Sequence, residues 1–280
     1  MIDVAVVGSL HLDIMVAAPR LPGRDETLMG SSWHRKCGGK GGNQAAAAAR
    51  MGARVAFGGA VGADEFGDAL RANLLRAGVD VTHLLTDPTQ GSGMSVAIEE
   101  EGGEYGAVVV SGANRGILAE GLGERWAPLW DARVLLLQNE VPEAVNLAAA
   151  RAAKERGARV VLNAAPARVS SEDLLALVDV LVVNRVEARM LTGEEGEAAL
   201  RGLGAPERDV VLTIGAEGLL LQTRGGAVTR IPATPVEAKS SHGAGDAFCG
   251  TLGARLAAGD EIEVACRAAS EAAARFVSGL

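Results

Sequence analysis

Aromatic residues and basic charge are both scarce in this chain of 280 residues. Aromatic residues make up only 3% of it, so stacking platforms for single-stranded nucleic acid are not expected. The formal net charge is -8, which argues against a nucleic-acid partner because binding to a phosphate backbone relies on clusters of Lys and Arg. An acidic protein that binds a nucleotide must therefore concentrate positive potential locally.

Cysteine is also rare, and long apolar runs are missing. Cys37, Cys249 and Cys266 are an odd number without metal-like spacing, so we expect no disulfide framework and interpret each as a small apolar filler. No apolar run approaches the length of a membrane span, and the first eight residues read as a strand rather than a cationic leader. We therefore expect a cytoplasmic protein without a membrane partner.

Short apolar runs alternate with Ala-rich stretches from end to end, without a repeat, a low-complexity linker or a charge block. This alternation predicts an α/β layer sandwich formed by residues 1–280 as one domain. Two hairpins stand outside the alternation. One joins residues 14–16 to residues 27–33 around a Pro- and Gly-rich turn, and the other joins residues 92–100 to residues 105–111.

Two glycine-rich stretches run into Ala-rich helices, CGGKGGNQ at residues 37–44 and GAGDAFCG at residues 243–250. A helix start offers unpaired amides and a partial positive charge, which together bind anions. In the second stretch such amides would lie beside the carboxylate of Asp246, which suits phosphoryl chemistry; alternatively, Asp246 only caps or charges the first turn. The first stretch matches neither the phosphate-loop pattern nor GxGxxG, so a Rossmann dehydrogenase loses its main support.

Together with GSLHLD at residues 8–13, these two motifs resemble those of the ribokinase-like (PfkB) family of carbohydrate and nucleoside kinases, over essentially the whole chain. The resemblance implies a three-layer αβα sandwich with a mainly parallel central sheet. It also implies a small β-sheet lid, inserted at about residues 12–36 and 92–111. Lids of this type often pair between subunits, which implies a homodimer; alternatively, the lid is shielded by its own loops.

The resemblance implies an ATP-dependent phosphotransferase that acts on an alcohol group of a sugar. Asp246 is then the base that accepts the proton of the attacking hydroxyl, and the amides of Gly243, Ala244 and Gly245 stabilise the transferring phosphoryl group. The residues that the resemblance places around the sugar, besides Asp246, are His11, Asp13, Gly39, Lys40, Asn43 and Glu140. Without the resemblance, Asp13 would be interpreted as a turn residue and Glu140 as a solvated residue ahead of a helix.

The nucleotide side follows from the same resemblance. The implied ATP contacts are Asn184, Thr213, Gly215, Gly218 and Gly245. Asn184 and Glu187 are three residues apart on one helical face and match a pair that organises magnesium and phosphates, largely through water. For Asn184, a helix cap is the competing explanation.

Some positions depart from the family pattern. Ser240 stands where ribokinases carry an Asp that helps to hold a monovalent cation, and the chain ends at Leu280 without the tail that completes that site, so we predict little or no activation by potassium. His11 replaces the usual Asn, whereas His242 is interpreted as a variable loop residue. The polar cleft favours a ribose-like pentose or a ketohexose as acceptor. A nucleoside, a sugar acid or a catalytically silent ligand-binding homologue stays open as an alternative.

Overall fold

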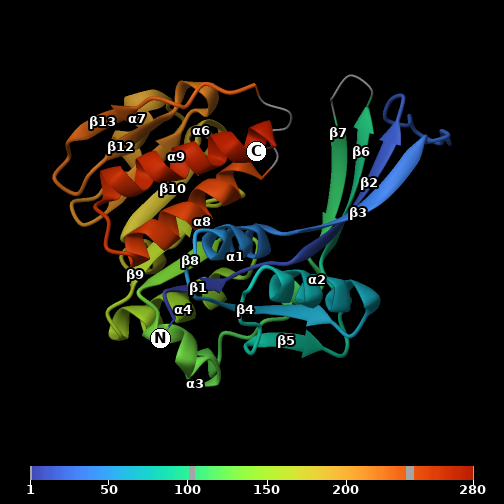
Figure 1. Cartoon of the computed structure of the whole chain (residues 1–280), viewed down its shortest axis with the longest axis horizontal. Helices are drawn as coiled ribbons and strands as arrows, with labels where there is room; N and C mark the ends of the chain where they lie inside the picture. Colours follow the sequence, from blue (N-terminus) through green and yellow to red (C-terminus); the bar gives the residue numbers. More distant parts are fainter. Residues whose placement is uncertain (1, 101–104, 238–242, 280) are drawn as a thin grey trace.

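The computed structural model describes residues 2–100, 105–237 and 243–279 (Figure 1). Within these ranges a nine-stranded sheet has the order β13-β12-β11-β10-β9-β8-β1-β4-β5. Neighbouring strands are parallel from β5 to β11, and β12 and β13 add an antiparallel edge. The strands of this sheet are β1 (Val4–Val7), β4 (Val55–Gly62), β5 (Leu84–Asp87), β8 (Val134–Gln138), β9 (Arg159–Asn163), β10 (Val180–Asn184), β11 (Asp209–Thr213), β12 (Leu219–Gln222) and β13 (Val228–Ile231).

Helices cover both faces of this sheet because its strands are apolar on both sides. Along β1, Val4 and Val6 pack into one hydrophobic cluster while Ala5 and Val7 pack into the other, as the two-residue period of a strand requires. The first face is covered by α1 (Lys40–Arg50), α2 (Glu65–Arg76), α8 (Ala244–Ala257) and α9 (Ile262–Ser278). The second is covered by α3 (Leu122–Arg125), α4 (Glu143–Glu155), α5 (Glu172–Leu175), α6 (Arg185–Thr192) and α7 (Gly196–Leu203). The predicted α/β fold is confirmed.

A second, four-stranded sheet projects from this body and has the order β3-β2-β6-β7 (Figure 1). Its strands are β2 (His11–Ala18), β3 (Ser32–Gly38), β6 (Met94–Glu100) and β7 (Tyr105–Val110). The predicted hairpin is present as the antiparallel pair β2–β3, but its second strand was placed too early: β3 begins only at Ser32, which pairs with Ala17. The chain is still turning before that point: the carboxylate of Glu26 accepts hydrogen bonds from Arg20 and from the amide of Gly23.

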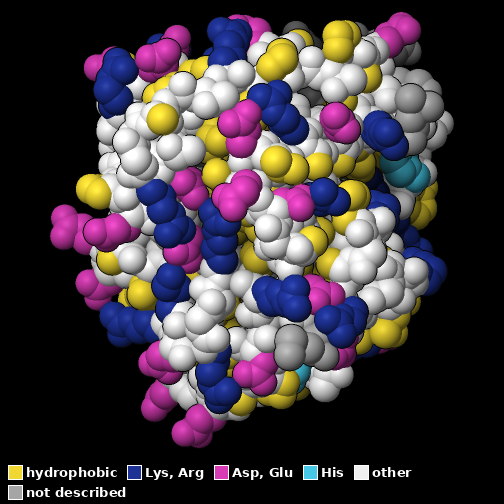
Figure 2. Space-filling model, turned by 60° about the vertical axis from the view of Figure 1, so that its left-hand side comes forward, with side chains coloured by type: hydrophobic (Ala, Val, Ile, Leu, Met, Phe, Trp, Pro, Cys, Tyr) yellow, Lys and Arg dark blue, Asp and Glu magenta, His cyan; other side chains and the backbone are white. Residues whose placement is uncertain are grey.

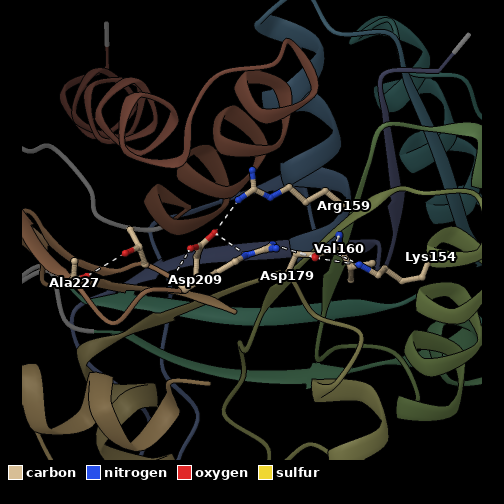
Figure 3. A network of polar contacts seen from close by, with 8 residues as sticks. Lys154, Arg159, Val160, Asp179, Asp209 and Ala227 are labelled. Atoms are coloured by element: carbon tan, nitrogen blue, oxygen red, sulfur yellow. Dashed lines mark hydrogen bonds and ion pairs between the residues drawn. The ribbon is translucent and has the colours of Figure 1, made fainter. Parts of the chain in front are cut away.

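A buried ionic network ties together the amino ends of β9, β10 and β11 (Figure 3). Asp209 accepts a hydrogen bond of 2.8 Å from Arg159, and its side chain is only 5% exposed. Asp179 accepts bonds from Lys154, at 3.0 Å, and from the amide of Val160, at 2.8 Å. The guanidinium of Arg224 reaches both carboxylates. Two carboxylates can be buried here because each is paired and hydrogen-bonded.

The surface carries charge of both signs. Figure 2 shows Lys and Arg side chains intermixed with those of Asp and Glu over the face in view. None of the helices in the described ranges combines the length and the apolar character that a bilayer-spanning helix needs.

Candidate active site

The carboxyl ends of the parallel strands meet at one edge of the large sheet, where open α/β sheets bind their ligands. Glu140 follows β8, Asn184 ends β10 and Thr213 ends β11. The starts of α1 and α8 reach the same region, because Asn43 and Gln44 in α1 contact Asp246 in α8. The fold therefore gathers residues from five separate parts of the sequence.

Asp246 lies in the first turn of α8, where it is 7% exposed. Its carboxylate accepts a hydrogen bond of 3.0 Å from Asn43 Nδ2 and one of 3.1 Å from Gln44 Nε2. Burial raises the pKa of Asp246, although the charge of Lys40 and these two hydrogen bonds oppose the rise. A carboxylate held in this way is a better proton acceptor near neutral pH than an exposed one.

Gln44 is a site residue that our sequence reasoning missed. It is fully buried, and its Oε1 accepts a hydrogen bond of 2.9 Å from Gln138 Nε2, which continues the polar chain from Asp246 into the core. Asn146 in turn donates to the carbonyl of Gln138 at 2.8 Å. The available signal was its place in the Gly-rich motif, as the last polar residue before a run of alanines.

The start of α8 has the geometry expected of an anion-binding helix terminus. Gly243 precedes the helix with a φ of 91°, in the left-handed region that favours glycine. The amide of Ala247 donates to the carbonyl of Gly243 at 3.0 Å. The amides of Ala244 and Gly245 precede this first bond of the helix and belong to the turn that has no intrahelical acceptors. The predicted trio of small residues thus forms one helix start beside Asp246.

A pocket of about 470 Å³ is lined by residues from β2, α1 and the segment after β8. Its lining includes the predicted residues His11, Lys40 and Glu140. The carboxylate of Glu140 accepts a hydrogen bond from Ser9 Oγ and another, of 2.9 Å, from the amide of Lys40, while His11 Nδ1 lies 3.8 Å away. Burial lowers the pKa of Lys40, but the negative charges of Asp246, Glu140 and Glu187 together have the larger effect and raise this pKa. This ammonium therefore stays charged.

Two other predicted sugar residues, Asp13 and Gly39, are not in the lining of this pocket. Asp13 accepts a hydrogen bond of 2.5 Å from Ser95 Oγ. Gly39 has a φ of 87°, and a Cβ at this position would lie 2.7 Å from the amide nitrogen of His11. A side chain at position 39 would therefore collide with the protein's own backbone. The lining also contains Arg115 and Arg168, which our sequence reasoning missed.

A smaller cavity of about 140 Å³ adjoins this pocket, with which it shares Lys40. Asn184, Glu187 and Asp246 are among its lining residues. Asn184 Oδ1 accepts from the amide of Glu187 at 2.9 Å, and the amide of Asn184 donates to Glu187 Oε2 at 2.8 Å. This capping box shows that Asn184 caps α6, and Asn184 and Glu187 both line the cavity. Burial raises the pKa of Glu187, with Lys40 among the groups that oppose the rise.

A long groove of about 500 Å³ continues from the small cavity, and the two share Thr213, Gly245 and Phe248. The predicted nucleotide residues Gly215 and Gly218 also line this groove. Gly218 has a φ of 95°, and a Cβ there would lie 2.0 Å from the carbonyl oxygen of Ile231, so only glycine fits. The remaining walls are mostly apolar and come from residues 233–236 and from α9.

No three or more His, Cys, Asp or Glu side chains in the described part of the chain are grouped so as to hold a metal ion. Magnesium keeps several waters and takes few protein ligands, so Glu187 beside Asp246 is a donor set of the kind it uses with phosphates. Ser240 and His242, on which two of our predictions fall, lie outside the described residues.

A buried carboxylate beside a helix start with free amides, between a polar pocket and a groove, suits the transfer of a phosphoryl group to an alcohol. The chain belongs to the pfkB family of carbohydrate kinases, whose model matches residues 1–279. Ribokinase from Haemophilus influenzae is 34% identical over 98% of this chain and 91% of its own length. Deoxyribokinase from Salmonella typhi is 31% identical over 99% and 93%. The structure of Arabidopsis thaliana ribokinase complexed with ribose and ATP superimposes with a TM-score of 0.89 at 28% identity, covering 99% of this chain and 93% of that one.

Proposed function

We propose that this carbohydrate kinase transfers the γ-phosphoryl group of ATP to a terminal hydroxyl of a ribose-like sugar. The observation that carries the proposal is the position of Asp246 and Gly245 between two larger spaces. Asp246 lines the small cavity, which shares Lys40 with the polar pocket and Gly245 with the long groove. A sugar in the pocket and ATP in the groove would therefore meet beside Asp246.

In the proposed reaction, the acceptor hydroxyl forms a bond to the γ-phosphorus while its proton passes to Asp246. The bond between the γ-phosphorus and its bridging oxygen breaks, and ADP leaves. The amides at the start of α8 would stabilise charge on the transferring group, and Lys40 would add a fixed positive charge at the junction. A placed base contributes roughly 10² to 10⁴ in rate, and positioning and electrostatics supply much of the rest.

Glu187 is the residue that we propose for magnesium, held largely through water, with Asn184 beside it at the start of α6. Magnesium, when bound, would neutralise phosphate charge. Burial is the main cause of the raised pKa of Glu187. A nearby divalent cation would lower this pKa again, so binding of the ion would favour the ionised carboxylate.

A ribose-like sugar is our first choice of acceptor because the polar pocket offers hydrogen-bonding groups of both kinds. Glu140 accepts, Lys40 donates, and His11 adds an imidazole where the family usually has an amide. The Arabidopsis relative, which was solved with ribose and ATP, supports the same choice.

We also propose that the four-stranded sheet pairs with that of a second copy to form a homodimer. Val108 and Val110 on β7 are 70% and 52% exposed, and Trp33 on β3 is 64% exposed. Large apolar side chains on a two-faced sheet favour association. Sedimentation velocity of the wild type and of Val108→Lys tests this, since the variant should be a monomer.

An ADP-release assay with magnesium and ATP, across ribose, fructose, other pentoses, sugar acids and nucleosides, tests the catalytic proposal. Each acceptor is compared with a blank that lacks acceptor. A strong signal with ribose or a close relative supports it. Silence across the panel, with ATP binding intact by calorimetry, would identify a protein that binds its ligands without turnover.

A further inference from the structure

The polar pocket holds more positive charge than a neutral sugar requires. Its charged lining consists of one carboxylate, Glu140, against the cations Lys40, Arg115 and Arg168, with His11 in addition. Glu140 already accepts from Ser9 and from the amide of Lys40. Apart from Glu140, the lining of the pocket offers the two arginines no carboxylate.

The two guanidinium groups differ in how they are held. Arg168 is fixed by bonds of 3.2 Å to the carbonyl of Val141 and of 3.1 Å to Asn139 Oδ1, and Glu143 lies 3.6 Å from its Nε. Burial lowers the pKa of Arg168 and the positive charge of Arg115 lowers it further, whereas the negative charge of Glu143 raises it. The guanidinium groups of the two arginines are thus close enough to repel one another.

Arg115 has no comparable partner. Within the described residues, it takes part in no ion pair and no side-chain hydrogen bond. Its backbone is nevertheless firmly placed: the preceding residue, Asn114, is fully buried, accepts from the amide of Leu10 at 2.9 Å and donates to the carbonyl of Leu10 at 2.8 Å. The fold therefore anchors an otherwise unpaired cation at the wall of the pocket.

The size of the pocket leaves room for a further group. A pentose has about ten heavy atoms and, at roughly 30 Å³ for each water-sized group, fills at most about 300 Å³. The pocket measures about 470 Å³. Lys40 also lines the cavity that holds Asp246, whereas Arg115 and Arg168 line only the pocket. An acceptor whose hydroxyl lies beside Lys40 would extend its other end toward the arginines.

We propose that Arg115 and Arg168 form a subsite for a carboxylate carried by the acceptor, so that this kinase favours an acidic sugar over a neutral one of the same length. This inference rests on the proposed function, because it concerns the acceptor of the same reaction. A charge-assisted hydrogen bond from each arginine would hold the carboxylate. Arg115 would act as a specificity-determining residue, and Arg168, held by Val141 and Asn139, would position the carboxylate.

The test compares D-ribonate with ribitol, which have the same carbon chain and terminal hydroxymethyl group but differ in the carboxylate. Calorimetry without ATP should show that ribonate binds to the wild type about tenfold tighter than ribitol does. This factor is the low end of the range for hydrogen bonds to charged groups, and we expect the low end because Arg115 is exposed. Arg115→Gln should remove this preference. Arg125→Gln, which changes an exposed arginine outside the pocket lining, should retain it. Added salt should weaken the preference in the wild type.

Equal binding of ribonate and ribitol to the wild type would overturn the proposal, as would an unchanged preference in Arg115→Gln. A parallel titration with inorganic phosphate separates the sources of the anion. Phosphate binding that depends on Arg115, without a preference for ribonate, would mean that the site takes a free anion, which also overturns the proposal. ADP release with ribose and ribonate is measured separately. A preference for ribonate in binding, without ADP release from either acceptor, would refute the proposed function and leave the subsite standing.

Discussion

Replacing Gln44 by Met should shift the pH dependence of turnover without touching the proposed base. Gln44 Nε2 donates to Asp246 Oδ1 at 3.1 Å, and a donor to the ionised carboxylate lowers its pKa. Removing that donor leaves burial and Asn43 in place, so the pKa of Asp246 should rise. Met is close to Gln in length and flexible, so the cavity should stay filled.

The size of the shift follows from the hydrogen bond that is lost. A hydrogen bond to a charged group contributes about 1.5 to 3 kcal/mol, and one pKa unit corresponds to about 1.4 kcal/mol. The acid limb of kcat/KM should therefore move upward by about one to two pH units. Because the base must be unprotonated, the variant should be slower than the wild type below its raised pKa and nearly equal to it on the alkaline plateau.

The assay is kcat/KM for the best acceptor from pH 5 to pH 9, with circular dichroism at each pH to confirm folding. Gln138→Met is the matched control. It removes the bond of 2.9 Å to Gln44 but leaves the contact with Asp246, so its acid limb should move by less than half a unit. A folded Gln44→Met enzyme whose acid limb coincides with that of the wild type would show that protonation of Asp246 does not limit the reaction.

Four further outcomes are expected. Asp246→Asn should lower kcat by at least roughly 10² while ATP binding by calorimetry is retained; near-normal turnover would refute the assignment of the base. Asp209→Asn should lower the free energy of unfolding by about 2 kcal/mol in urea, because it removes the charge of a buried carboxylate that pairs with Arg159 and Arg224. The exposed Asp131→Asn should cost less than about 0.5 kcal/mol, and equal losses would contradict this explanation. Hydrogen bonds from Arg54 lower the pKa of Asp3, so this pair stabilises the fold above the unfolded pKa of about 4 and loses its effect as the pH falls through the lowered value. The Tm deficit of Asp3→Asn should accordingly be present at pH 7 and shrink on acidification, and a constant deficit would count against the ion pair. Turnover should be the same in sodium and potassium buffers, and a large increase in potassium would contradict the prediction drawn from Ser240.

The sequence alone determined which residues form the helix starts of the site. GAGD and GGKGGN are local patterns, in which glycines permit the turn and the following residues favour helix, so their geometry depends little on the rest of the chain. The same holds for the strands of the large sheet, whose short apolar runs, alternating with Ala-rich stretches, predicted the α/β fold. The capping box of Asn184 and Glu187 is also local, because the two residues are only three positions apart in the sequence.

Only the tertiary structure decided which distant residues meet. Gln44 and Gln138 are far apart in the sequence, and their contact exists because α1 packs against the sheet beside β8. Arg115 and Arg168 share a pocket because the 3-10 helix after β7 and the segment after β9 both reach it, and no periodicity or motif marks either residue. The register of β3 also depended on pairing: its start is fixed by the ladder to β2 and by the turn that Glu26 closes. A local pattern specifies dihedral angles and burial, whereas long-range contacts depend on how whole elements pack.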